Sequence, residues 1–349
     1  MNSPDYFSID TYDYDLPQEL IAQTPADPRD SCRLLVLRRS DGSIVHQRFR
    51  DILQWLVPGD VLVRNDTRVM AARLNGVKVN GSAKSEILLL RPEDESERSW
   101  EALVRPGRKL PEGSGVRLPD GTIVTIGAVK SDDGVRSVSF PEGCDVRAIA
   151  EKNGAMPLPP YIHERTSRPE DYQTVYSRDP RSAAAPTAGL HFTRELLDAV
   201  RAKGVTIADL TLEVGLGTFR PVKTHDIREH HMHTERCTIP QSTYDAIVAA
   251  KKDGRRVIAL GTTVVRTLEG MASTPEGLHP GALETGIYIY PGYQYKVVDA
   301  LITNFHLPKS TLIMLVAAFA GYDVTMKAYA EAVRERYRFF SFGDAMLII

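Results

Sequence analysis

The stretch RVIALGTTVVR, residues 256–266, decides the fold of this chain. Its first five residues form a short apolar run typical of a buried strand, and the apolar positions from Thr263 to Met271 follow helical spacing. Gly261 supplies the turn between them. A strand that passes through a glycine turn into a helix is typical of an α/β sheet, which binds ligands outside the carboxyl ends of its strands. The stretch therefore predicts a fold class and the edge of the sheet that carries a site.

The same alternation of strands and helices runs from about residue 149 to the C-terminus. We expect helices over Leu196–Lys203, Tyr244–Lys252, Thr263–Met271, Ser310–Ala320 and Met326–Arg336. We expect strands over Val205–Val214, Arg256–Leu260, Gly286–Tyr290 and Val297–Ile302, and a hairpin near the N-terminus from Arg33–Leu37 and Ile44–Gln47. This pattern implies a largely parallel sheet with helices on both faces.

Between about residues 60 and 145 the pattern changes to short β-like runs joined by turns such as Asn75-Gly76 and Asp120-Gly121. The runs include Val61–Val63, Ala71–Leu74, Glu86–Leu90, Trp100–Val104, Gly115–Leu118, Thr122–Ile126 and Val135–Phe140. Many short strands at regular spacing favour a small barrel or sandwich. The predicted fold is therefore α/β, a three-layer sheet domain with helices on both faces formed by residues 1–59 and 148–349, with a small β-barrel domain inserted at residues 60–147.

The composition is that of an ordinary globular protein. A chain of 349 residues is too long for one core, and 42% hydrophobic with 25% charged residues argues against disorder. The N-terminus lacks the basic and apolar regions of a signal peptide, and the longest apolar run, residues 312–319, is too short to span a membrane. Cys32, Cys144 and Cys237 share no metal-ligand spacing, which argues for a reducing compartment. We therefore expect a cytoplasmic protein without membrane contact.

A net charge of −2 does not indicate a nucleic-acid-binding protein, which usually carries a basic domain. Contact with RNA would need local patches. Two candidate patches are Arg64, Arg68, Arg73 and Lys78, and then Arg105, Arg108 and Lys109. A solvated face with scattered acids explains these runs as well.

Three segments have the chemistry of ligand sites. Gly261, Thr262 and Thr263 start a helix, whose free N–H groups attract an anion, although an ordinary N-cap explains them equally well. Gly215 and Gly217 follow a predicted strand like a truncated dinucleotide fingerprint, but the third glycine is missing. The small-residue loop 185–193, APTAGLHFT, lets a ligand approach the backbone closely.

Two further segments carry titratable or aromatic side chains. The cluster His225, His230, His231, His233 and Glu235 favours a general acid or base over a zinc site, because no third ligand stands at a set spacing. The aromatic stretch 337–344 can stack a base or pack in the core.

Taken together, these segments resemble the S-adenosylmethionine:tRNA ribosyltransferase-isomerases of queuosine biosynthesis, nearly from end to end. The motifs that carry the resemblance include Asp15-Leu16-Pro17, Asp30–Leu35 (DSCRLL), Asn65–Val69 (NDTRV), Met156–Ile162 (MPLPPYI), Ala184–Phe192 (AAPTAGLHF), Gly215–Phe219 (GLGTF), Met232–Glu235 (MHTE), Gly261-Thr262-Thr263, Val298–Pro308 (VDALITNFHLP) and Tyr337–Met346 (YRFFSFGDAM).

The resemblance implies a reaction in which the ribosyl part of S-adenosylmethionine moves to the aminomethyl group of a 7-deazaguanine at the tRNA wobble position. Isomerisation gives epoxyqueuosine, and adenine and methionine leave. The family works without metal or further cofactor, because S-adenosylmethionine is consumed as a substrate. The partners implied are tRNA and S-adenosylmethionine, and we expect a monomer.

The chemistry needs a base for the carbon next to the sulfonium, a proton donor for adenine and a neutral amine. The pool of candidate acids and bases is His191, His233, His306, Asp66, Glu235 and Glu213. Candidates for substrate binding are Thr187, Gly189, Gly215, Gly217, Thr218, Gly261, Thr262, Thr263, Arg266, Asn304, Arg68, Lys309 and Asp344. The inserted β domain is expected to contact the tRNA.

Two residues depart from the family pattern, which usually has histidine at the position of Glu213 and glycine at that of Arg181. Glu213 must then replace the histidine if that residue is a base, although the usual pKa of a carboxyl is lower. Two other hypotheses stay open: a metal hydrolase built on the histidine cluster, and an inactive tRNA-binding protein.

Overall fold

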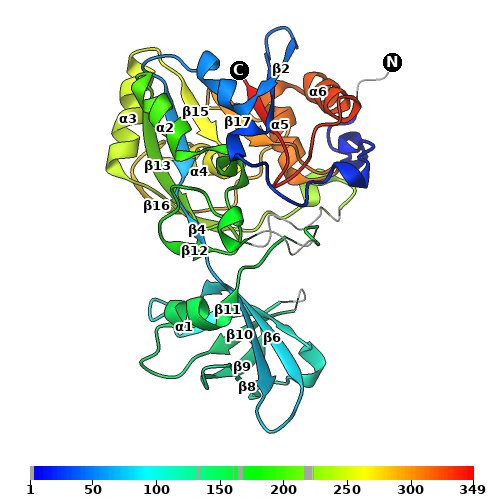
Figure 1. Ribbon diagram of the computed structural model, residues 1–349, viewed down its shortest axis with the longest axis vertical. Coiled ribbons are helices and arrows are strands. Elements are labelled where there is room, and N and C mark those ends of the chain that lie inside the picture. Colours follow the sequence, from blue (N-terminus) through cyan, green and yellow to red (C-terminus); the bar gives the residue numbers. More distant parts are fainter. Residues whose placement is uncertain (1–3, 132–133, 160, 164–167, 216–221, 223) are drawn as a thin grey trace.

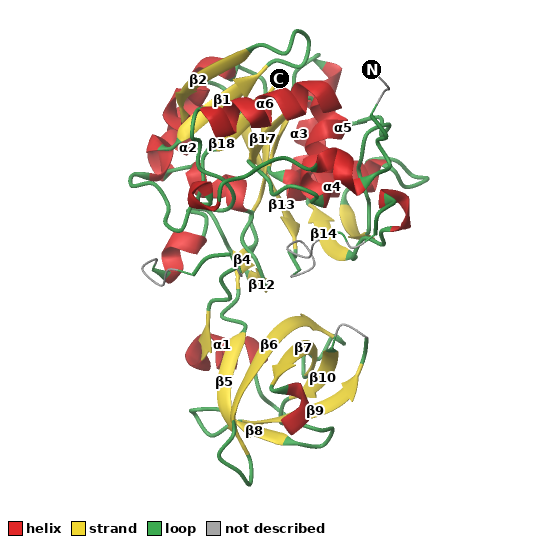
Figure 2. Ribbon diagram, turned by 90° about the vertical axis from the view of Figure 1, so that its right-hand side faces the viewer, coloured by secondary structure: helices red, strands yellow, loops and turns green. Residues whose placement is uncertain are grey.

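The chain folds into a large α/β lobe and a smaller β lobe joined by two connecting segments, as two views at right angles show (Figures 1 and 2). The computed structural model describes residues 4–131, 134–159, 161–163, 168–215, 222 and 224–349. The described chain starts at residue 4 and ends at Ile349 in the large lobe, so the small lobe is an insertion.

A nine-stranded sheet in the order β16-β14-β13-β3-β15-β17-β18-β1-β2 forms the centre of the large lobe. Its strands are β1 Arg33–Leu37, β2 Ile44–Arg48, β3 Val61–Asn65, β13 Thr206–Leu212, β14 Glu235–Ile239, β15 Val257–Leu260, β16 Gly281–Thr285, β17 Ala300–Asn304 and β18 Ala345–Ile348. The four central strands β13, β3, β15 and β17 are parallel. Their carboxyl ends therefore meet at one edge of the sheet.

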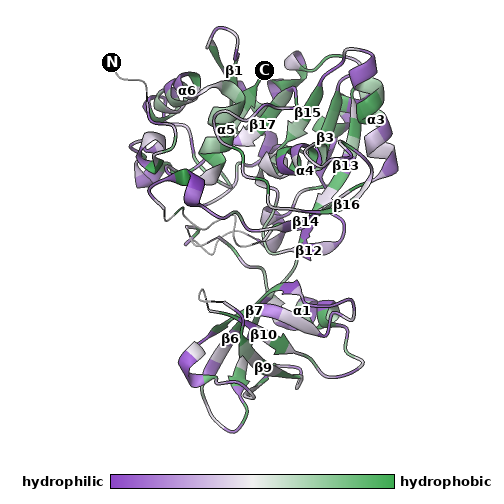
Figure 3. Cartoon of the chain, turned by 180° about the vertical axis from the view of Figure 1, so that it is seen from behind, coloured by the Kyte–Doolittle hydropathy of each residue, from purple (hydrophilic) through white to green (hydrophobic). Residues whose placement is uncertain are grey.

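Helices cover both faces of this sheet, which confirms the predicted three layers. The α-helices of the large lobe are α2 Arg194–Ala202, α3 Gln241–Lys252, α4 Thr262–Ala272, α5 Thr311–Ala320 and α6 Tyr322–Arg334. Because alternate residues of a strand point to opposite faces, Leu34 and Val36 of β1 pack with α2, whereas Leu35 and Leu37 pack with α3 to α6. Figure 3 shows the central strands β15 and β17 largely in the hydrophobic colour, whereas helix α3 mixes hydrophobic and hydrophilic residues.

Helix α4 is buried over nearly its whole length, from Thr262 to Met271. Gly261 precedes it with a φ of +97°, a conformation that side chains with a Cβ rarely adopt. The sharp turn brings the start of α4 directly under the carboxyl ends of the strands. Within the described residues no single helix is long and apolar enough to cross a membrane. Helices α5 and α6 reach that length only together, and the chain bends by 117° between them.

The small lobe is a closed β-barrel, as predicted. Its strands are β5 Arg73–Lys78, β6 Lys84–Pro92, β7 Ser99–Arg105, β8 Gly115–Arg117, β9 Ile123–Val129 and β10 Val135–Ser139. Pairing of β5 with β8 closes the barrel, and β11 Gly154–Ala155 adds to β5. Helix α1, Val146–Asn153, is capped by the Asp145 carboxylate and packs on the barrel core. A two-stranded sheet of β4 Arg68–Val69 and β12 Pro180–Ser182 lies where the lobes meet (Figure 1).

Several expected elements differ from the structure. Val61–Val63 was expected in the inserted domain but belongs to β3 in the middle of the large sheet, because all five residues of β3 are buried. The barrel sheet instead runs from Arg73 to Ala155. The strand expected at Gly286–Tyr290 is wrong; the strand is β16, an edge strand whose alternating burial gives no apolar run. The other expected elements of the large lobe are present within a few residues.

Candidate active site

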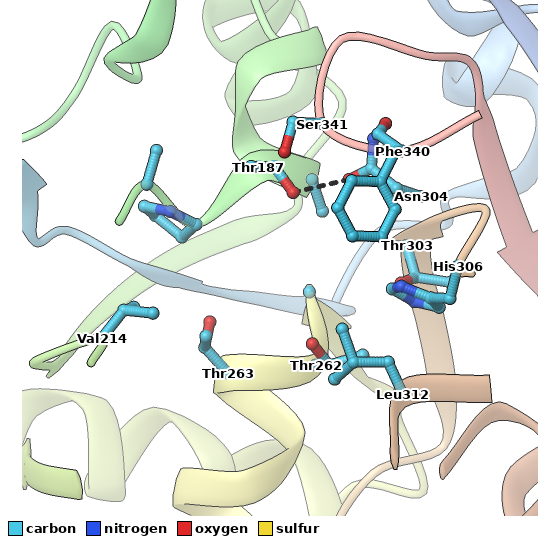
Figure 4. A pocket seen from close by; sticks show the side chains of 14 residues that line it. Thr187, Val214, Thr262, Thr263, Thr303, Asn304, His306, Leu312, Phe340 and Ser341 are labelled. Carbon is cyan, nitrogen blue, oxygen red and sulfur yellow. Dashed lines mark hydrogen bonds between the residues drawn. The ribbon is translucent and has the colours of Figure 1, made fainter. Parts of the chain in front are cut away.

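A cavity lies at the edge where the parallel strands end (Figure 4). The segments that follow β15 and β17, the loop before α2 and the loop before β18 contribute its walls. It is lined by Ala185, Pro186, Thr187, Ala188, Val214, Gly261, Thr262, Thr263, Thr303, Asn304, His306, Leu312, Phe340 and Ser341. The structure thus brings together five of the predicted binding residues, Thr187, Gly261, Thr262, Thr263 and Asn304, with His306 from the predicted acid–base pool. We call this space the donor cavity.

The start of α4 forms one side of the donor cavity. Among the described residues no side chain caps this helix, so the N–H groups of its first turn face the cavity. Thr263 is 9% exposed, and its buried Oγ1 has no hydrogen-bond partner among those residues. Free N–H groups, the helix dipole and an unused hydroxyl together fit a carboxylate.

A buried polar chain supports the opposite wall. Thr187 Oγ1 lies 3.1 Å from Asn304 Oδ1, and Asn304 Nδ2 lies 3.0 Å from both His191 Nε2 and the Phe340 carbonyl oxygen. His191 Nδ1 is 3.3 Å from Cys32 Sγ. Burial, helped by Arg338 and Arg29, lowers the pKa of His191 to about 3, so the ring is neutral. His191 therefore acts on the cavity through Asn304.

His306 and Phe340 give the donor cavity a neutral imidazole and an aromatic ring. His306 Nε2 is 2.8 Å from Thr303 Oγ1, and burial lowers its pKa to about 3. Phe340 has a φ of +73°, an uncommon backbone conformation for a bulky residue, and its ring packs edge-on against Tyr161. Tyr337, Phe339 and Phe342 of the same aromatic stretch pack in the core, so only part of that stretch serves a site.

A second cavity lies between the two lobes. The barrel contributes Leu90, Arg91, Pro92, Glu93, Glu101 and Val135 to its lining, and the large lobe contributes Arg181, Glu213, Val214, Gly215, Met232, His233, Thr234, Glu235, Arg236 and Glu284. Val214 lines both cavities, so they adjoin. We call the second space the interlobe cavity.

The predicted residues His233, Glu235 and Arg266 form one group at the wall of the interlobe cavity. Glu235 is buried, pairs with Arg266 and accepts from the N–H of Gly215 at 3.0 Å. Burial would raise the pKa of Glu235, but Arg266, His233 and the Gly215 N–H outweigh it and hold the pKa below its usual value. His233 Nε2 lies 3.3 Å from Glu235 Oε1. The group is an imidazole positioned by a buried carboxylate, and Arg266 is committed to that carboxylate rather than to a ligand.

The two residues that depart from the family pattern contact each other. Arg181 Nη1 is 3.6 Å from Glu213 Oε1, and both residues line the interlobe cavity. The side chain of Arg181 is 45% exposed and that of Glu213 is 21% exposed. The larger side chain at position 181 thus provides the charge that compensates the carboxylate at 213.

Four predicted site residues, Asp66, Asp344, Lys309 and Arg68, are outside the described lining of both cavities. Asp66 accepts from Thr211 at 2.7 Å, and burial raises its pKa. Asp344 accepts the N–H groups of Arg33 and Arg338, while Lys309 pairs with Asp10 and Asp13. Arg68 is exposed, 3.4 Å from Ser177 Oγ. The contacts of these four residues are with neighbouring parts of the protein.

Gly189 allows close packing rather than ligand approach, because a Cβ there would lie 2.0 Å from the Tyr176 hydroxyl. In the predicted basic patches, Arg64 is buried against Asp209 and the Tyr176 ring, and Arg73 pairs with Glu86. Gly217 and Thr218 lie outside the described residues. No group of three or more His, Cys, Asp and Glu side chains that could hold a metal is found in the described part of the chain.

Several lining residues were missed from the sequence. Thr303 is the last residue but one of strand β17, and the carboxyl end of a strand is itself a signal for a site. Arg91, Glu101 and Glu284 belong to ordinary-looking strands, and the sequence carries no signal for them because their cavity exists only between two lobes.

Comparisons with known proteins identify the family of the chain. The family model for queuosine biosynthesis proteins matches residues 9–348. The chain is 52% identical over 341 residues to the S-adenosylmethionine:tRNA ribosyltransferase-isomerase of Symbiobacterium thermophilum, covering 98% of this chain and 99% of the relative. It is 54% identical over 342 residues to the same enzyme of Thermosipho africanus, covering 97% and 99%.

A solved structure shows the same likeness. The crystal structure of an S-adenosylmethionine tRNA ribosyltransferase from Thermotoga maritima is 40% identical in sequence, covers 97% of this chain and is itself covered completely, with a TM-score of 0.57. With matches that run through both lobes and through the residues of both cavities, the chain belongs to the queuosine biosynthesis family of S-adenosylmethionine:tRNA ribosyltransferase-isomerases.

Proposed function

We propose that the chain moves the ribosyl moiety of S-adenosylmethionine onto the aminomethyl group of a 7-aminomethyl-7-deazaguanine at the tRNA wobble position and isomerises it to the epoxycyclopentane of epoxyqueuosine. Adenine and methionine leave. The observation that carries the proposal is the pair of adjoining cavities with Val214 in common. One lies at the ends of the parallel strands, where α/β sheets bind small ligands, and the other lies between the two lobes, where a base on a large RNA can enter.

The donor cavity offers a partner for each end of S-adenosylmethionine. The methionine carboxylate binds the first-turn N–H groups of α4 and Thr263 Oγ1, which are otherwise unused among the described residues. The adenine ring stacks on Phe340. His306 stays neutral because burial lowers its pKa, so it does not repel the sulfonium.

The interlobe cavity supplies the acid and base groups. Glu213 follows β13 directly and precedes Val214, the residue that both cavities have in common. We assign it as the base that takes the proton from the carbon next to the sulfonium, because its side chain lines the interlobe cavity beside the residue that both cavities have in common. His233, positioned by Glu235, takes the proton of the aminomethyl ammonium so that the amine can attack.

The barrel provides the surface for tRNA in this proposal. Lys84 pairs in register with Val77, and Val77 pairs with Arg117, so the three exposed side chains form one row across β6, β5 and β8. Arg105 lies on the neighbouring strand, opposite Glu86. Lysine and arginine in such a row bind phosphates without reading sequence.

Charge reversal tests the barrel surface. The double variant Lys84→Glu and Arg117→Glu should weaken tRNA affinity at least ~10-fold. The slope of log affinity against log salt concentration should become shallower by about two, one for each lost phosphate contact. Lys252→Glu with Lys327→Glu changes net charge equally on exposed helices of the large lobe and should bind normally. Unchanged affinity of the barrel variant would exclude this surface.

We further propose that the chain acts as a monomer in the cytoplasm and needs no additional cofactor. S-adenosylmethionine is consumed, so no bound group has to be regenerated.

Adenine release tests the proposed function directly. The protein is incubated with S-adenosylmethionine and with tRNA that carries either the aminomethyl-deazaguanine or guanine at the wobble position. Adenine release only with the modified tRNA, together with a mass gain on that base, is the expected result. Binding of tRNA without adenine release would instead identify an inactive tRNA-binding protein.

A further inference from the structure

We infer that Thr187 offers the donor cavity only hydrogen-bond acceptors, so that its partner is an N–H or O–H group on the nucleoside part of the donor. The inference rests on the proposed function, in which S-adenosylmethionine occupies this cavity. It follows from the buried polar chain of Cys32, His191, Asn304 and Thr187, whose direction is fixed at one end.

The fixed end is the carbonyl of Phe340. A carbonyl oxygen only accepts, so the atom of Asn304 that lies 3.0 Å from it must be the amide nitrogen Nδ2. This decides the orientation of the Asn304 side chain from its partners. The oxygen Oδ1 then faces Thr187 Oγ1 at 3.1 Å.

The second hydrogen of Asn304 Nδ2 points at His191 Nε2, 3.0 Å away. That ring nitrogen must accept, so it carries no proton. A neutral imidazole keeps one proton, which sits on Nδ1 and points at Cys32 Sγ, 3.3 Å away. His191, 4% exposed, is thus a positioning residue that locks the amide of Asn304.

Thr187 has one hydroxyl hydrogen, and it is donated in the hydrogen bond to Asn304 Oδ1. What remains toward the cavity is a pair of lone pairs, which repel a carboxylate and attract a donor. In Figure 4 Thr187 lies across the cavity from Thr262 and Thr263, where free N–H groups attract the carboxylate. The two sides together orient the donor, with its carboxylate at α4 and a ribose hydroxyl or the adenine amine at Thr187.

Binding of S-adenosylhomocysteine, a stable probe, tests the assignment. Thr187→Val, which keeps the shape but removes the oxygen, should weaken the probe roughly tenfold, while Thr187→Ser should bind like the unaltered protein. The 2′-deoxy, 3′-deoxy and inosine forms of the probe locate the partner: the form that lacks the partner group should bind equally to the Thr187→Val variant and to the unaltered protein.

Two results would overturn the assignment. In the first, Thr187→Val binds every probe as tightly as the unaltered protein does; in the second, Thr187→Val weakens the binding of every probe by the same factor. Failure of the unaltered protein to bind S-adenosylhomocysteine would count against the proposed donor cavity instead. The direction of the hydrogen bonds in the buried polar chain can also be measured without a ligand. Nitrogen-15 NMR should show His191 protonated at Nδ1 only, its signals being those missing in His191→Asn. A proton on Nε2 would contradict the inferred direction.

Discussion

At the scale of single residues, Arg181 and Glu213 make the sharpest test of the chemistry. Their ion pair is partly exposed, and such pairs contribute at most about 1 kcal/mol to stability. If Glu213 is the base, Glu213→Gln should lower kcat by about 10²–10⁴-fold without a comparable loss of stability. Adenine release and thermal unfolding, measured on the same preparations, separate the two effects.

The matched control exchanges both residues for the family-typical pair. The double variant Arg181→Gly and Glu213→His replaces one compensated site by another, so it should retain turnover. Arg181→Gly alone leaves the Glu213 carboxylate without this partner. Its turnover should lie between that of Glu213→Gln and that of the double variant. Full turnover of Glu213→Gln would remove Glu213 from the mechanism.

His191 and His306 predict how stability depends on pH. Burial lowers the pKa of each from 6.5 to about 3, so between these values the unfolded chain binds protons that the folded chain does not. Their contribution is complete above pH 6.5 and is lost as pH falls toward 3, by about 1.4 kcal/mol per pH unit for each histidine. Urea unfolding between pH 7 and pH 5 measures this slope.

The variant His306→Gln keeps a polar group near Thr303 but does not titrate. It should reduce the slope by the share of one histidine, about 1.4 kcal/mol per pH unit. His163→Gln, at an exposed position, is the control. A slope that stays the same in His306→Gln would show that this imidazole is not buried in its neutral form.

At the scale of elements, the turn into α4 decides where the donor carboxylate binds. Gly261 has φ +97° and ψ 159°, and Gly321 at the start of α6 has nearly the same values, φ +92° and ψ 141°. Alanine at either position is strained by about 1–3 kcal/mol. Both Gly261→Ala and Gly321→Ala should lower the free energy of unfolding, but only Gly261→Ala should weaken donor binding, measured by calorimetry. Equal donor affinity in both would argue against the α4 site.

Elements could be predicted from the sequence where the pattern of residue types matches the burial of the element in the fold. The run 256–266 has a buried strand, a glycine turn and a helix start, and each is visible in residue type alone. β16 was missed because an edge strand is partly polar, and β3 was put in the wrong domain because its neighbours β13 and β15 come much later in the chain.

The same limit applies to the site. Thr187, Thr262, Thr263 and Asn304 were predicted because they follow strands or precede helices, where ligands bind. Asp344 was predicted from a motif, yet its carboxylate accepts the backbone N–H groups of Arg33 and Arg338 and pairs with the Arg338 side chain. A motif marks which residues are specific to a family, and only packing separates those that touch a ligand from those that hold the loop.

At the scale of the whole molecule, Arg147 links the two lobes beside the interlobe cavity. It lies on α1 of the barrel lobe, binds Glu97 through Nε at 2.6 Å and Nη2 at 2.8 Å, and donates through Nη1 to the carbonyl of Pro180 in β12 of the large lobe. Arg181 follows Pro180 directly and pairs with Glu213. The position of the barrel is thus coupled to the position of the proposed base.

Arg147→Gln should therefore loosen the interlobe cavity and leave the donor cavity intact. We expect kcat/KM for the modified tRNA to fall roughly tenfold, because charge-assisted hydrogen bonds of this kind contribute about 1.5–3 kcal/mol, with S-adenosylhomocysteine affinity unchanged. Arg201→Ala, which removes a surface pair with Asp198 within α2, controls for the loss of any arginine. If both variants process tRNA equally well, the Arg147 contacts are not needed to place the wobble base of the tRNA next to Glu213.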